Sequence, residues 1–254
     1  MSSQILQKLI FTAVLLIIIV AVVGYQISQM QTQNYAEEVA YATALFKQAG
    51  DFITTHAAQG GEAKFGSQLR FGTIKLTREG MCLVRFDVGG GDGNIITLYQ
   101  GLNSQLRYET PRRLYGETWV FDRGDGPHAY VTNPNHVDVI YHHSMEGYTY
   151  VTFRTAAYVA VTKTSGTLTI TIYVFYLDSK SAGGTGVFTL TTQTETVGEH
   201  LRFMAPSGSS IGLYIQSGTD PSGHSLEEQV PLPPVSPGDL IDVSVNLVKV
   251  DVAW

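Results

Sequence analysis

Residues 9–25 read LIFTAVLLIIIVAVVGY, an apolar stretch in which only Thr12 and Gly24 interrupt the large hydrophobic side chains. No charged residue occurs between Lys8 and Glu37. The stretch and its apolar flanks reach the roughly 20 residues that a helix needs to cross a bilayer. In lipid a helix satisfies its own backbone hydrogen bonds, whereas a single strand leaves them unpaired. The sequence therefore predicts a hydrophobic helix at the start of the chain.

The helical pattern continues beyond residue 28 but becomes one-sided. Apolar residues recur at alternating spacings of four and three, the period of one helical face, and most polar residues fall off that face. This predicted stripe, which we expect to pack on the rest of the chain, consists of Tyr35, Val39, Ala42, Phe46, Ala49 and Ile53. The first proline is Pro111, and Gly60 and Gly61 provide a stop signal. We predict one nearly continuous helix from about Gln4 to Ala58, roughly 80 Å long, within a first unit of residues 1–59.

Three interpretations of the apolar segment compete. It could be a cleaved secretory signal, although Lys8 is the only charge ahead of it. It could be a signal-anchor that holds a surface domain at the membrane. It could also leave the membrane and pack against copies of itself. The long one-sided continuation favours the third interpretation, because a simple anchor is more often followed by a flexible polar linker.

The remainder of the chain, residues 62–254, alternates short runs of β-formers with turns rich in Gly, Pro, Asn and Asp. We predict strands over 68–77, 81–88, 95–99, 105–110, 117–122, 128–132, 137–143, 148–154, 157–162, 167–177, 187–195, 201–204, 211–216 and 240–252. Residues Ser217–Gly238 carry five prolines and are predicted to form a stiff surface loop. The expected fold class is α+β: a long N-terminal hydrophobic helix followed by an all-β antiparallel sandwich with Ig-like or Greek-key-like connections.

Composition excludes several functional classes. The chain has 16 Lys and Arg against 22 Asp and Glu, a net charge of −6, which argues against a nucleic-acid partner. Cys82 is the single cysteine, so an intrachain disulfide and a four-cysteine zinc site are both impossible. Its apolar neighbours indicate a buried, inert thiol. No cofactor is expected.

Four motifs resemble functional sites, but none of them predicts one. Gly208–Gly212 matches the Gly-x-Ser-x-Gly pattern with Ser210 at its centre, but it lacks the strand before it and the helix after it. The oxygen-rich turn 87–94 lacks the glutamate that completes an EF-hand. Arg123-Gly124-Asp125 is an adhesion tripeptide too short to carry weight. The histidines His128, His136, His142 and His143 are expected to be solvent-exposed rather than metal ligands.

The combination of the apolar run 9–25, its unbroken one-sided extension and a single all-β domain resembles the archaeal type IV pilin-like proteins, which include adhesive pilins and archaellins. Bacterial pilins typically carry Glu at the fifth mature position, where this chain has Ile5. In that family a short basic leader is removed, which implies either that Met1 is the first mature residue of a longer precursor or that the leader is absent.

The resemblance implies a structural subunit of an extracellular filament, without catalysis. Its helices would form the filament core and its β-domains the outer sheath. The partners would be identical subunits, the membrane before assembly, and host-cell or abiotic surfaces. The alternatives are an archaellin of a motility filament and a membrane-anchored cell-surface or connector protein. The residues expected to form the core are Leu9, Ile10, Phe11, Val14, Leu15, Leu16, Ile17, Ile18, Ile19, Val20, Val22 and Val23.

Overall fold

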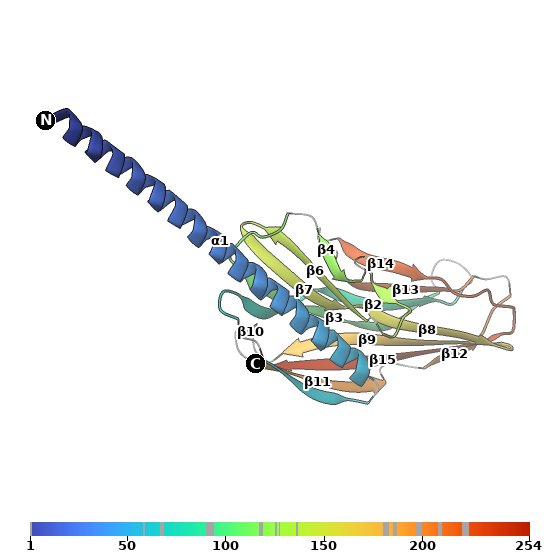
Figure 1. The fold of residues 1–254 in the computed structure, drawn as a ribbon. Coiled ribbons are helices and arrows are strands. Elements are labelled where there is room, and N and C mark those ends of the chain that lie inside the picture. The colour runs from blue at the N-terminus through green and yellow to red at the C-terminus, as the bar shows by residue number, and fades with distance from the viewer. Residues whose placement is uncertain are drawn as a thin grey trace.

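The fold was taken from a computed structural model. It describes residues 2–57, 59–66, 69–89, 94–116, 119–124, 126, 128–135, 137–179, 183–184, 187–196, 200–207, 210–219 and 224–254. The chain consists of one long helix followed by a β-rich head (Figure 1).

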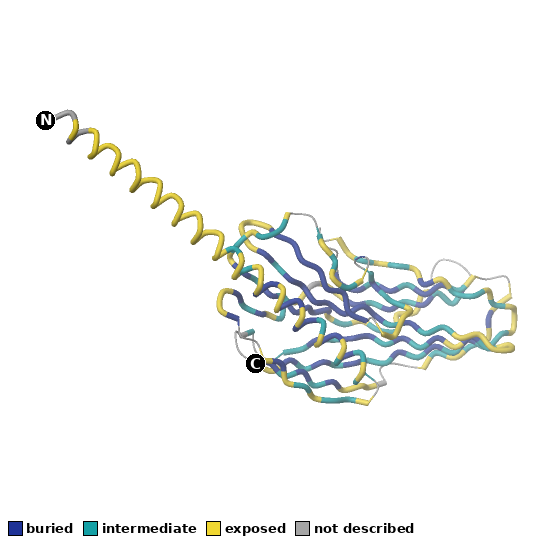
Figure 2. The backbone as a smooth tube through the Cα atoms, viewed as in Figure 1, coloured by how far each residue is buried: buried dark blue, intermediate teal, exposed yellow. Residues whose placement is uncertain are grey.

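Helix α1 spans Ser2–His56 without a break. Its N-terminal half projects away from the head, and its C-terminal half lies across strands of both sheets (Figure 1). Every residue from Gln7 to Gln31 is exposed, whereas buried positions recur from Glu38 onward (Figure 2). The apolar run and the one-sided stripe together therefore form a single helix, as predicted.

The strands form two sheets. Among the described residues, the first sheet has the strand order β1-β11-β15-β9-β8-β5, with β12 also paired to β15. Its strands are β1 Gly61–Gly66, β5 Tyr130–Val131, β8 Ala157–Thr164, β9 Thr167–Ser179, β11 Val187–Thr196, β12 Leu201–Met204 and β15 Leu240–Ala253. Most pairs are antiparallel, but β15 runs parallel to β9 and β5 runs parallel to β8.

The second sheet has the order β14-β13-β2-β3-β7-β6-β4, with β10 also paired to β2. Its strands are β2 Thr73–Asp87, β3 Ile95–Thr110, β4 Val120–Arg123, β6 Asp138–Met145, β7 Tyr148–Thr155, β10 Gly183–Gly184, β13 Gly212–Thr219 and β14 Ser225–Val230. All of its described pairs are antiparallel. The α+β class with an N-terminal helix and a sandwich-like, mostly antiparallel head is confirmed.

The head has two hydrophobic clusters, and the helix belongs to one of them. The helix-side cluster joins the C-terminal half of α1 to both sheets; it includes Phe46, Ile53, Leu106, Phe153, Phe175, Phe188 and Val250. The distal cluster lies between the sheets farther from the helix; it includes Val84, Phe86, Leu168, Ile170, Val174, Ile215 and Val243.

The two clusters contact opposite faces of the same strands. In β2 a bulge between Arg78 and Met81 inserts an extra residue relative to β3, so the alternation of side chains changes phase there. In β9 the consecutive residues Val174 and Phe175 are both buried, one in each cluster. Because successive strand side chains point to opposite faces, one face of the sheets receives the helix and the other closes the sandwich.

Several predicted strand boundaries were wrong. The segment Ser217–Gly238 is not one loop: β13 extends to Thr219, and β14 pairs with it as an edge strand from Ser225 to Val230. The two strands predicted at 95–99 and 105–110 are one strand, β3. Strands β1 and β10 were not predicted, because their glycines and short length resemble turns.

Candidate functional site

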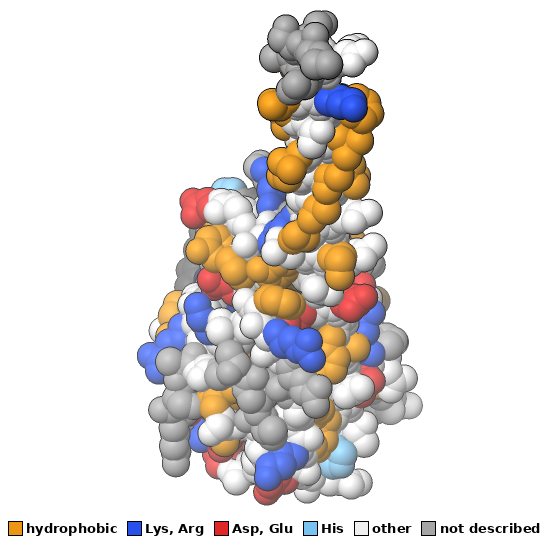
Figure 3. All heavy atoms as spheres, turned by 60° about the vertical axis from the view of Figure 1, so that its left-hand side comes forward, with side chains coloured by type: hydrophobic (Ala, Val, Ile, Leu, Met, Phe, Trp, Pro, Cys, Tyr) orange, Lys and Arg blue, Asp and Glu red, His pale blue; other side chains and the backbone are white. Residues whose placement is uncertain are grey.

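The N-terminal half of α1 is a large, exposed apolar surface. The twelve residues predicted to form a filament core all lie there, with exposed fractions from 45% at Leu15 to 69% at Phe11. Their side chains cover the projecting helix (Figure 3). Among the described residues, one helix, Gln7–His56, is long and apolar enough to cross a membrane, judged by length and composition alone. None of the residues in its most apolar 18-residue stretch is buried. A surface of this kind must be covered by lipid or by protein.

The head first contacts the helix at a neck formed by Thr32, Tyr35, Phe71 and Arg112. The Arg112 Nη2 atom donates a hydrogen bond to Thr32 Oγ1 at 2.7 Å. The Arg112 guanidinium also lies 5.7 Å from the centroid of the Tyr35 ring, which packs on Phe71 at 4.7 Å. Tyr35, the first residue of the predicted stripe, is therefore half-buried at the neck rather than in the core.

One turn farther, Glu38 fastens the helix to the loop before β2. Its buried carboxylate accepts backbone N–H bonds from Arg70 at 2.8 Å, Phe71 at 3.1 Å and Gly72 at 2.8 Å. The Tyr108 hydroxyl donates a fourth bond at 2.9 Å. Burial raises the pKa of Tyr108, so the phenol remains a donor. Bonds to a carboxylate are about twice as strong as neutral ones. The sequence did not predict this role of Glu38, because nothing local distinguishes it from its neighbour Glu37, which is the same residue type and faces solvent.

The remaining stripe residues lie in the helix-side cluster. Val39, Ala42, Phe46, Ala49 and Ile53 are each at most 1% exposed. The Phe46 ring contacts Phe153 of β7 with centroids 5.9 Å apart. The C-terminal half of α1 is thus part of the hydrophobic core of the head.

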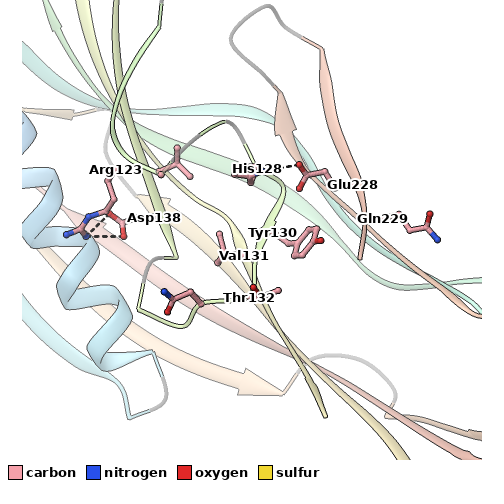
Figure 4. A pocket seen from close by; sticks show the side chains of 11 residues that line it. Arg123, His128, Tyr130, Val131, Thr132, Asp138, Glu228 and Gln229 are labelled. Atoms are coloured by element: carbon pink, nitrogen blue, oxygen red, sulfur yellow. Dashed lines mark hydrogen bonds and ion pairs between the residues drawn. The ribbon is translucent and has the colours of Figure 1, made fainter. Parts of the chain in front are cut away.

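A second polar contact holds the helix near its end. Arg123 of β4 reaches the buried Asp138 of β6 at 3.0 Å (Figure 4). It also reaches Asp51 of α1 at 2.8 Å. Burial lowers the pKa of the Arg123 guanidinium, but the bonds to Asp51 and Asp138 outweigh it and raise the pKa. Burial also raises the pKa of Asp138, against the opposing charge of Arg123. The arginine of the adhesion tripeptide is thus used inside the molecule, and Asp125 lies outside the described residues.

Beside this contact lies a cavity of ≈ 870 Å³, lined in part by His128, Tyr130, Asp138 and Glu228 (Figure 4). Its charged groups already have partners. Glu228 accepts from Ala129 N at 3.0 Å and lies 3.2 Å from His128 Nδ1, while Asp138 binds Arg123. Across the described part of the chain, no group of three or more His, Cys, Asp or Glu side chains could hold a metal ion.

The prediction that the histidines are exposed was wrong for two of them. His142 is buried, 2.9 Å from Asp122, and stacks on Tyr115. His143 is buried and stacks on Trp119 at 4.3 Å. Burial, with the positive charge of Arg107, lowers the pKa of His143 to about 4. The two side chains point to opposite faces of β6, and each stacks on an aromatic residue from the segment before β4, which a strand pattern alone does not reveal. His136 lies outside the described residues.

The other motifs stay apart. Ser210 is exposed, and residues 208–209 lie outside the described part of the chain. In the turn after β2, Asp87 Oδ1 accepts a bond from Gly89 N at 2.9 Å, and residues 90–93 are not described. Cys82 is 4% exposed, and burial raises the pKa of its thiol to about 12.

In comparisons with protein-family models, with curated proteins and with solved structures, nothing matches this chain. The feature of the chain that points most directly to a function is its exposed apolar helix, which is anchored in a β-rich head.

Proposed function

We propose that this protein is the subunit of an extracellular type IV pilus-like filament, with the apolar halves of α1 in the core and the β-rich heads outside. The observation that supports the proposal most directly is the all-round exposure of the apolar segment on a helix that is rigidly anchored at its other end. Before assembly this segment would reside in the membrane.

Mutual burial of these helices would strongly favour assembly. Fully burying a Val, Leu, Ile or Phe side chain is worth about 1.5–3 kcal/mol, and the twelve side chains are already partly shielded by their own helix, so each helix would gain on the order of 10 kcal/mol. This gross gain in free energy exceeds that of an ordinary surface contact, and contacts between identical subunits are enough to supply it. The likeness to archaeal pilin-like proteins rests on this same plan of helix and head.

The outward surface suits an adhesive role. On one face of β8 and β9, Thr162 pairs with Thr169 and Thr164 pairs with Thr167. Of these, Thr162, Thr164 and Thr169 are exposed. Such a hydroxyl-rich face can contact cells or abiotic surfaces by hydrogen bonding. An archaellin shares the same plan, and a motility assay of cells lacking the protein separates the two roles.

A second candidate function is a membrane-anchored connector, favoured by the length and composition of the apolar segment. It would purify as a monomer or small oligomer in detergent. Electron microscopy of the purified native protein distinguishes the two candidates, because helical polymers and detergent micelles differ in shape.

The decisive variant is Ile18→Asp, with Ile18→Leu as the matched control. Ile18 is 56% exposed in the middle of the segment, so the head does not depend on it. We expect Ile18→Asp to abolish filaments while the melting temperature of the head is unchanged, and Ile18→Leu to assemble normally. Intact filaments from Ile18→Asp would refute the proposal.

A further inference from the structure

The charged residues of α1 divide into those that are used within the subunit and those that are not. The helix carries five: Lys8, Glu37, Glu38, Lys47 and Asp51. Glu38 binds the loop before β2, Lys47 lies 3.7 Å from Asp122, and Asp51 binds Arg123. Among the described residues, Lys8 and Glu37 form no ion pair or side-chain hydrogen bond, and both are exposed.

These two residues bound the long uncharged part of the helix. Lys8 precedes the apolar segment and Glu37 follows it, at the neck. If the apolar segments of several subunits pack together, Lys8 is removed from water together with them. A buried charge without a partner is strongly destabilising. Within the described helix, Glu37 is the one carboxylate that its own subunit leaves available to compensate it.

We propose that Lys8 of one subunit forms an ion pair with Glu37 of a neighbouring copy. This inference rests on the proposed function, since it specifies the register of the same helix packing. For parallel helices, a separation of 29 positions at 1.5 Å per residue sets the two copies about 44 Å apart along the helix axis.

The side chains around Glu37 leave room for the lysine. A hollow of ≈ 310 Å³ at the neck is lined by Asn34, Glu37, Tyr41 and Arg70, among others. Arg70 shares this hollow but forms no ion pair with Glu37 within 4.0 Å. The stem of Lys8 can lie along Tyr41, which is 41% exposed, while its ammonium group meets the carboxylate.

The solvent face of α1 is compatible with this register. Ala36, Ala40 and Ala44 are exposed and spaced by four residues, so they form a shallow stripe beyond the neck. An offset of 29 places Phe11 of the neighbouring copy opposite Ala40, and Leu15 opposite Ala44. Large side chains then meet small ones, which allows two helices to approach closely.

A charge-swap experiment tests the pair on purified full-length protein. Filament mass is measured by sedimentation after detergent removal, so that membrane insertion does not enter the result. We expect Lys8→Glu and Glu37→Lys each to reduce filament mass by about tenfold or more, because each places like charges together. The double variant is expected to recover to within about twofold of the unmodified protein. Glu62→Lys, at an exposed site on β1, is the control and should assemble normally.

The outcomes separate the two proposals. If the unmodified protein forms no filaments, the proposed function and this register both fail. If it forms filaments but the single variants assemble normally, or the double variant does not recover, the ion pair alone is overturned. A helical reconstruction gives a second readout: neighbouring subunits offset by about 44 Å along the helix axis are expected, and their absence overturns the register.

Discussion

Arg123 and Asp138 form an ion pair, 3.0 Å between Nη1 and Oδ2, in which the Asp138 side chain is completely buried. The same Arg123 nitrogen reaches Asp51 on α1 at 2.8 Å. One guanidinium thus joins β4, β6 and the helix, and it neutralises a carboxylate that has no access to water. The pair links the position of the helix to the interior of the head.

Replacing Arg123 by alanine is expected to destabilise the head strongly. The change leaves Asp138 as an unpaired buried carboxylate, which costs about 3–5 kcal/mol. Chemical denaturation followed by tryptophan fluorescence measures the free energy of unfolding. The control is Lys75→Ala, which breaks the more exposed pair with Glu109 and should cost less than about 1 kcal/mol. Equal losses in the two variants would contradict the role given to Arg123.

Glu38 and Glu37 are adjacent, and they are expected to respond differently to the same substitution. Glu38→Gln replaces one of the two carboxylate oxygens, which accept four bonds, with an amide nitrogen that cannot accept them, so we expect a loss of about 2 kcal/mol. Glu37→Gln should leave the stability of the head unchanged, because Glu37 is exposed. Thermal unfolding of the two variants measures the difference. Equal melting temperatures would mean that both residues are simply surface charges.

Two glycines of α1 provide a matched pair. A Cβ atom at Gly50 would lie 2.3 Å from Asp138 Oδ2, whereas one at Gly24 would meet nothing within 4 Å. Alanine normally favours a helix over glycine by about 1 kcal/mol. We therefore expect Gly50→Ala to destabilise the head by about 1–3 kcal/mol through overpacking, and Gly24→Ala to cause no loss. Differential scanning calorimetry measures both, and an unaffected Gly50→Ala would show that the helix lies farther from β6.

The buried His143 should make the head less stable in acid. Its folded pKa of about 4 lies below the ordinary value of about 6.5, so its contribution is complete above pH 6.5 and is lost as the pH falls through 4. A difference of this size corresponds to about 3 kcal/mol. Asp138, whose pKa is raised, makes the head more stable as the pH falls. The contribution of His143 is therefore obtained by comparing the unmodified protein with a variant that lacks this histidine.

The measurement is the free energy of unfolding at pH 7 and pH 4 for the unmodified protein and for His143→Phe. The variant should lose less stability between the two pH values, by about 3 kcal/mol. His200→Gln is the control, because His200 is 57% exposed in its side chain. An unchanged pH dependence in His143→Phe would mean that the ring titrates normally.

The helix was predictable because its signals are local. The run 9–25 and the stripe through Phe46 and Ile53 each repeat over several turns. Strands such as β12, Leu201–Met204, were predicted to the residue because turns bound them on both sides. What escaped prediction depends on contacts between distant segments. Strand β14 exists because it pairs with β13, with Val230 opposite Leu213, and no local pattern encodes that pairing.

The polar side chains that hold the helix escaped prediction for the same reason. Nothing near Glu38 in sequence indicates that the N–H groups of residues 70–72 converge on it. Arg123 was noticed only as part of a short tripeptide, and its buried partner Asp138 lies 15 positions away. Periodicity predicted the stripe residues, whereas it did not predict the bonds that fix the helix to the head.

The packing of α1 into the head has a mechanical consequence. Because α1 is a member of one cluster, a pull on the head would reach the helix through packed side chains rather than through a flexible linker. In an assembled polymer the tensile load would then pass directly from the sheath into the core.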